Sequence, residues 1–132
     1  MEYAQTICRL YYLMIHADGD VTESELRVGK QIMKLEGLAE AMLEAEFENC
    51  RLLSKPELTD LCISSLNRLT TKYQIRSLAW MYIVSEIDWA VDKTERLVIE
   101  QILANTVKVP HSEIALVESE LSKNLVSFQE LV

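Results

Sequence analysis

The stretch DGDVTESE, residues 18–25, decides the fold because it recurs as DWAVDKTE at residues 88–95. Asp18 aligns with Asp88 and Glu25 aligns with Glu95, at a constant offset of 70 residues. A repeat at one fixed spacing indicates duplicated supersecondary structure. Each copy follows an apolar helical segment and precedes another, so both copies predict a turn that leads into a helix.

The segments around this repeat predict an all-α fold. The chain has three glycines and two prolines, is dominated by Leu, Ala, Glu, Met, Ile and Lys, and contains no alternating strand pattern. Apolar periodicity and helix-end signals predict seven helices, at about residues 2–17, 22–36, 39–53, 54–69, from 70 or 71 onward, 92–106, and from 112 onward.

The apolar run LAWMYIV, residues 78–84, is hydrophobic on nearly every side, which is typical of a central buried helix. Residues 10–15 align with residues 80–85 at the same offset of 70. We therefore expect helices one to three to repeat as helices five to seven, with helix four as a connector. The predicted architecture is a single domain, residues 1–132, in the form of a compact, pseudo-symmetric bundle of about seven helices.

Charge and cysteine content restrict the class of protein. Thirteen Lys and Arg against 21 Asp and Glu give a net charge of −8, which disfavours nucleic acid and anionic membrane as partners. Cys8, Cys50 and Cys62 form no CxxC pair and lie among apolar residues, so they predict buried free thiols and a reducing compartment. Neither a signal peptide nor an apolar run of bilayer length is evident, so we expect a soluble, cytoplasmic protein without membrane insertion.

The familiar enzyme motifs are missing from the sequence. No GxxxxGKS, GxGxxG, HExxH or GxSxG string occurs, so we expect no enzymatic activity. His16 and His111 are the two histidines, too few for a tetrahedral zinc site in a chain without CxxC. A short basic spacing at Arg68, Lys72 and Arg76 favours a solvated face, with docking of an acidic partner as the alternative.

Four aromatic residues lie within helix-period apolar segments, which favours core positions over stacking platforms for nucleic acid. They are Tyr11, Tyr12, Trp80 and Tyr82.

The two acidic segments together predict a possible site for a hard cation, Ca²⁺, Mg²⁺ or Mn²⁺, because carboxylate oxygens suit such ions. Neither segment alone is an EF-hand, since counting back from Glu25 places Met14 and His16 where the first ligands belong. The candidate ligands are Asp18, Asp20 and Glu25 from the first segment, and Asp88, Asp92 and Glu95 from the second.

Helix capping offers a competing explanation for some of these acids. Thr22 with Glu25, and Asp92 with Glu95, have the spacing of capping boxes. Capping does not require Asp18 or the aligned Asp88. Both lie at the ends of apolar helices, where negative charge is unfavourable. Those two aspartates therefore need either a turn role or a ligand role.

The segments ADGDVTESEL, residues 17–26, and IDWAVDKTER, residues 87–96, resemble the TerB-like domain of tellurite-resistance proteins, a family related to the N-terminal region of some membrane-anchored J-domain co-chaperones. Trp89 stands where the family has a glycine. The resemblance implies an all-helical, non-enzymatic domain that binds metal or acts as a scaffold in stress-response assemblies. The matching residues are Asp18, Gly19 and Glu25 in the first element, and Asp88 and Glu95 in the second.

Two functional hypotheses follow. The first is a non-enzymatic domain that binds a divalent cation between the two acidic segments, or acts as a scaffold, within a tellurite-resistance-like stress response. The alternative is a metal-independent protein-interaction module, in which an acidic surface or Trp89 contacts an unidentified protein partner.

Overall fold

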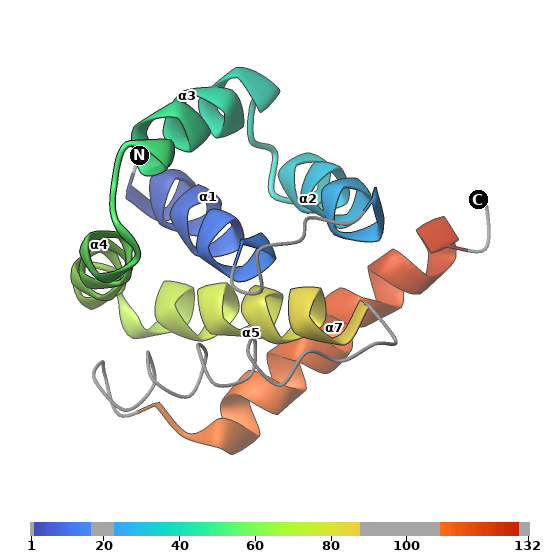
Figure 1. Ribbon diagram of the computed structural model, residues 1–132. Helices are drawn as coiled ribbons and strands as arrows, with labels where there is room; N and C mark the ends of the chain where they lie inside the picture. Colours follow the sequence, from blue (N-terminus) through green and yellow to red (C-terminus); the bar gives the residue numbers. More distant parts are fainter. Residues whose placement is uncertain (1, 17–22, 88–108, 130–132) are drawn as a thin grey trace.

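The computed structural model describes residues 2–16, 23–87 and 109–129 (Figure 1). Every regular element in these ranges is a helix, which confirms the all-α prediction for them. The sixth expected helix, residues 92–106, lies outside the described residues, so the total of seven and the internal repeat stay predictions. The described helices are α1 (Glu2–Ile15), α2 (Glu23–Leu35), α3 (Glu40–Arg51), α4 (Lys55–Asn67), α5 (Thr71–Ile87) and α7 (His111–Gln129).

Local sequence signals explain where α2 ends. Gly37 has a φ of 67°, in the left-handed region that a side chain disfavours. The Leu38 N–H donates to the Met33 carbonyl at 2.7 Å, and the Gly37 N–H donates to the Lys34 carbonyl at 3.2 Å. These two bonds form a Schellman motif, which satisfies the last carbonyl groups of the helix.

The start of α4 is fixed by a capping box. The Ser54 hydroxyl accepts from the Glu57 N–H at 3.3 Å, and the Glu57 carboxylate accepts from the Ser54 N–H at 3.0 Å. Pro56 has no backbone N–H, but in the first turn of a helix this group has no partner within the helix, so the proline is tolerated there. The predicted cap, early proline and acidic first turn are therefore confirmed.

Helix α5 is the centre of the described core. Its apolar run, residues 78–84, includes Leu78, Ala79 and Trp80, each at most 2 % exposed. The helix packs against α1, α2, α4 and α7, and in Figure 1 it runs between α1 and α7. The prediction of a central buried helix is confirmed. No helix in the described part of the chain is long and apolar enough to cross a membrane.

Helix α1 forms the second layer of this core, packed against α3, α4 and α5. Tyr11 is buried on α1 and Trp80 on α5, while Tyr12 and Tyr82 are half-buried against the core. The predicted core role of the four aromatic residues is confirmed.

Candidate functional site

Glu25 alone among the six candidate metal ligands falls within the described residues. It is the third residue of α2, and it is 1 % exposed. Asp18, Asp20, Asp88, Asp92 and Glu95 lie outside the described residues, as does the capping residue Thr22. Whether the two acidic segments meet therefore stays a prediction.

Glu25 lies where α2 packs closely on α1. The Tyr11 hydroxyl donates to the Glu25 backbone carbonyl at 2.6 Å. One turn further along α2, Gly29 makes room for this phenol, because a Cβ at that position would lie 2.2 Å from the Tyr11 hydroxyl oxygen. Burial, followed by the negative charge of Glu25, raises the pKa of Tyr11 above its ordinary value. The hydroxyl therefore stays protonated and acts as a donor.

The capping box at the start of α4 shows what capping requires of a glutamate. Glu57 is the third residue of α4, as Glu25 is of α2, and its side chain is exposed while it completes the Ser54 capping box. The hydrogen bonds from Ser54 lower the pKa of Glu57. Capping thus does not demand burial of the carboxylate.

The described ranges contain no cluster of three or more His, Cys, Asp or Glu side chains that could hold a metal ion.

The three cysteines are buried and free, as predicted. Burial raises the pKa of Cys8 to about 12 and that of Cys50 to about 11, and it raises the pKa of Cys62 as well. Burial thus keeps these thiols protonated, which makes them poor nucleophiles.

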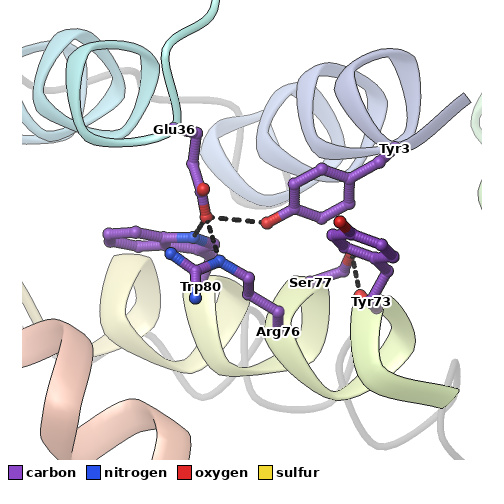
Figure 2. A network of polar contacts seen from close by, with 6 residues as sticks. All are labelled: Tyr3, Glu36, Tyr73, Arg76, Ser77 and Trp80. Atoms are coloured by element: carbon purple, nitrogen blue, oxygen red, sulfur yellow. Dashed lines mark hydrogen bonds and ion pairs between the residues drawn. The ribbon is translucent and has the colours of Figure 1, made fainter. Parts of the chain in front are cut away.

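A polar cluster that links three segments of the described structure centres on Glu36, directly after α2 (Figure 2). One carboxylate oxygen of Glu36 accepts from the Tyr3 hydroxyl at 2.7 Å and from the Arg76 Nε at 2.6 Å. The same oxygen accepts from the Trp80 indole N–H. Since Tyr3 lies on α1 and the other two donors lie on α5, this carboxylate joins three helices.

The charge on Glu36 is stabilised by these donors. Burial alone raises its pKa, but the three donated hydrogen bonds and the Arg76 charge outweigh burial, so the pKa lies below its ordinary value. The hydrogen bond to Glu36 raises the pKa of Arg76. Burial and the neighbouring carboxylate raise the pKa of Tyr3. The cluster therefore holds an ionised pair and a protonated phenol, an arrangement suited to fixing helices in place.

Neighbouring contacts extend the cluster along α5. The Tyr3 and Tyr73 rings lie 4.6 Å apart between centroids, and the Ser77 hydroxyl donates to the Tyr73 carbonyl at 2.7 Å (Figure 2). Sequence analysis did not single out Glu36. One feature of the sequence could have indicated its role. Glu36 lies next to Gly37 at a helix C-terminus, where the negative charge of an acid is unfavourable unless a cation compensates for it.

The basic spacing near the α4–α5 junction does not form one uniformly solvated face. Arg68 pairs with Glu2 on α1 at 3.3 Å, and Arg76 pairs with Glu36. The Lys72 ammonium lies 5.8 Å from the centroid of the Tyr73 ring. These residues thus make contacts within the chain, which weakens the case for a docking surface for an acidic partner.

A second, partly buried ion pair links α1 with α3, and its arginine also reaches α4. Arg9 Nε lies 3.1 Å from a Glu46 carboxylate oxygen, and the Arg9 guanidinium also donates to the Ser65 hydroxyl at 2.8 Å. The Arg9 side chain is 16 % exposed and that of Glu46 is 8 % exposed. Because a cation satisfies this carboxylate, the cluster is explained by helix packing.

The two histidines occupy exposed helix ends. His16 follows α1 and stacks on Tyr12, with ring centroids 4.0 Å apart, and His111 is the first residue of α7.

Comparisons of the chain with family models, curated proteins and solved structures gave no match.

Proposed function

We propose that this chain is a non-enzymatic, cytoplasmic domain that binds a divalent cation and acts in a TerB-like, tellurite-resistance-like stress-response assembly. The burial of Glu25 carries the proposal. An acidic side chain removed from water requires compensation by donors or by a cation. The exposed Glu57, at the same position of its own helix, shows that a capping carboxylate need not be buried.

The proposed ligand set comes from both acidic segments. Glu25 supplies one carboxylate, and the sequence repeat supplies Asp18, Asp20, Asp88, Asp92 and Glu95. Carboxylates gathered in this way suit Ca²⁺, Mg²⁺ or Mn²⁺, and the bound ion would relieve their mutual repulsion. This arrangement requires the internal repeat, in which helices one to three are duplicated as helices five to seven, to bring both segments to the same end of the bundle.

Titration of the full chain with Ca²⁺ and with Mn²⁺ tests the proposal, with calorimetry for Ca²⁺ and paramagnetic broadening of NMR signals for Mn²⁺. We expect saturable binding at millimolar ion and broadening centred on the first turn of α2. The Glu25→Gln variant should bind much more weakly, because Gln can occupy the third position of a capping box but has no charge. Glu57→Gln is the matched control, since it makes the same change at the third residue of α4.

Two outcomes would overturn the cation proposal. One is no saturable binding by the wild-type chain at millimolar ion. The other is equal binding by the Glu25→Gln variant and its Glu57→Gln control.

The second candidate function is a metal-independent protein-interaction module. Exposed apolar side chains favour it, because Leu52 between α3 and α4 is 83 % exposed and Leu116 on α7 is 67 % exposed. Exposed leucines at separate places are ordinary surface features, but either can serve as an anchor for a partner.

Retention of native partners on the immobilised chain, with and without chelator, separates the two functions. Partner binding that resists chelator and is lost in Leu52→Ser or Leu116→Ser favours the interaction module. Partner binding that is lost with chelator and in Glu25→Gln favours the cation-dependent assembly.

A further inference from the structure

A hollow of about 160 Å³ opens where the end of α1 meets the junction of α3 and α4. Neither Glu25, nor Glu36 with its donors, nor any cysteine lines it, so none of the sites described above accounts for it. Its lining residues are Tyr12, Leu13, His16, Leu53, Lys55 and Leu58.

The floor of this hollow is apolar. Leu13 and Leu58 are buried, and Leu53 is half-buried against the core. Phe47 of α3 packs edge-on against Tyr12, with ring centroids 5.0 Å apart, so one wall is aromatic and supported from behind. An interior cavity of about 150 Å³ takes benzene, so the hollow has room for one large apolar side chain, such as that of phenylalanine or leucine.

An exposed leucine stands beside this hollow on a backbone that is held in place. Leu52, which precedes the lining residue Leu53, is 83 % exposed. The Leu52 N–H donates to the Asn49 carbonyl at 3.3 Å, and the Leu53 N–H donates to the Cys50 carbonyl at 3.0 Å. The Ser54 capping box follows directly. The α3–α4 junction is therefore a fixed turn that presents an apolar side chain to solvent next to an apolar hollow.

The exposed side of α3, which leads to this turn, is acidic. Helix α3 packs mainly on α1 (Figure 1), and Glu40, Glu44 and Glu48 follow one another at one-turn intervals on its exposed side. Glu48 pairs with Arg51 at 2.6 Å, and Lys55 also interacts within the chain. Glu40 and Glu44 form no ion pair in the described part of the chain. This local charge and the net charge of −8 both favour a basic partner.

We propose that this hollow and the acidic side of α3 together dock a basic amphipathic helix of a partner protein. One large apolar side chain of that helix fills the hollow, and a second covers Leu52. Its Lys or Arg side chains, spaced one turn apart, lie over Glu40 and Glu44. A helix that reaches from Glu40 to Leu53 is about 20 Å long, so the partner segment has about 13 residues or more. The inference rests on the interaction module given above as the second candidate function, and it needs no cation.

A synthetic peptide serves as the probe. It is an alanine-based helix of about 18 residues, with lysines one turn apart on one flank and with leucine and phenylalanine on the adjoining face. NMR titration of the ¹⁵N-labelled full chain with this peptide should give saturable shifts of backbone signals in residues 12–16 and 40–58. Chelator should change nothing, which separates this site from the proposed cation site at Glu25.

Two control peptides separate the contribution of charge from that of apolar contact. The peptide with glutamate in place of every lysine should bind about tenfold or more weakly, because the ion pairs are replaced by repulsion. The peptide with alanine in place of phenylalanine should bind about tenfold more weakly and should no longer shift the signals of residues 12–16. Added salt should weaken binding of the original peptide, as expected for exposed charges.

Matched variants of the chain assign the contacts. Glu44→Lys should weaken peptide binding about fivefold or more, by loss of an ion pair and gain of a repulsion. Glu120→Lys makes the same change of charge at an exposed position of α7 and should change binding little. Leu52→Ser should weaken binding about fivefold by loss of apolar contact. All three side chains are exposed, and circular dichroism verifies that each variant keeps its helices.

No saturable shift with the basic peptide would overturn the proposal, as would equal binding of the acidic peptide or equal effects of Glu44→Lys and Glu120→Lys. Self-association of the chain that is lost in Leu52→Ser would also overturn it, since a second copy would then cover the hollow. Retention of native partners through Leu116 alone would overturn this inference and leave the interaction module standing.

Discussion

Removing the Glu36 carboxylate should destabilise the protein more than any change to a surface ion pair. The side chain of Glu36 is 8 % exposed, and its one oxygen accepts from Tyr3, Arg76 and Trp80. In Glu36→Ala, the Arg76 guanidinium and the indole N–H of Trp80 lose their acceptor. The contact between α2 and α5 would then contain a partly buried, uncompensated cation.

The expected loss in unfolding free energy follows from the burial of the Glu36–Arg76 ion pair and from the number of hydrogen bonds that are lost. Removing one partner of a buried ion pair costs about 3–5 kcal/mol. Arg76 is 32 % exposed, so water can reach part of its guanidinium and the loss should lie near the lower end of that range. Glu36→Gln keeps an oxygen acceptor but loses the charge, so its cost should be closer to the roughly 1.5–3 kcal/mol of one charged hydrogen bond.

Urea unfolding at neutral pH, followed by circular dichroism, measures these differences. The matched control is Glu48→Ala, which breaks the 2.6 Å pair with Arg51 on the surface of α3, where both side chains are at least 66 % exposed. A double-mutant cycle of Glu36→Ala with Arg76→Ala should give a clear coupling energy. The reasoning is refuted if Glu36→Ala costs no more than the control, or if the coupling energy is close to zero.

Three further predictions concern stability. Because the folded pKa of Glu36 is lowered, the stability that its charge contributes is complete above the ordinary Glu pKa of about 4.3 and is lost as pH falls through the lowered folded pKa. The difference in unfolding free energy between wild type and Glu36→Gln should therefore narrow in acid. A constant difference from about pH 7 to pH 3 would contradict this. Gly29→Ala should cost about 1–3 kcal/mol in urea unfolding, because its Cβ would collide with the Tyr11 ring, and an unchanged midpoint would disprove this close contact. Ser54→Ala should cost about 1 kcal/mol by loss of the α4 cap, with Ser64→Ala on the exposed face of α4 as the control that should change little.

The sequence was sufficient to predict the elements whose limits depend on local chemistry. Ser54, Pro56 and Glu57 mark the start of α4, and Gly37 marks the end of α2, because caps and left-handed residues act over one helical turn. The apolar run at residues 78–84 likewise identified the central helix, since a helix without a polar face has to be buried.

Long-range polar contacts could not be predicted in the same way. Glu36 meets its donors across 33, 40 and 44 residues of sequence, and no periodicity links such positions. Arg76 is an instructive case, since its spacing with Arg68 and Lys72 suggested a basic face, whereas its guanidinium pairs with a carboxylate on another segment. Within the candidate cation site, the sequence did not predict that Glu25 is buried, because a capping box has the same sequence pattern whether or not its acid is exposed.

The two ends of α2 are suited to different roles. At its C-terminal end, one oxygen of an ionised carboxylate accepts from donors on α1 and α5, so this end fixes the helix against both. At its N-terminal end, the contact with α1 uses the backbone carbonyl of Glu25, which accepts from the buried Tyr11 hydroxyl. That contact positions the first turn without using the Glu25 carboxylate. Under the cation proposal, the first turn of α2 would already be held in place before the ion binds, and the energy of binding would not be spent on ordering the helix.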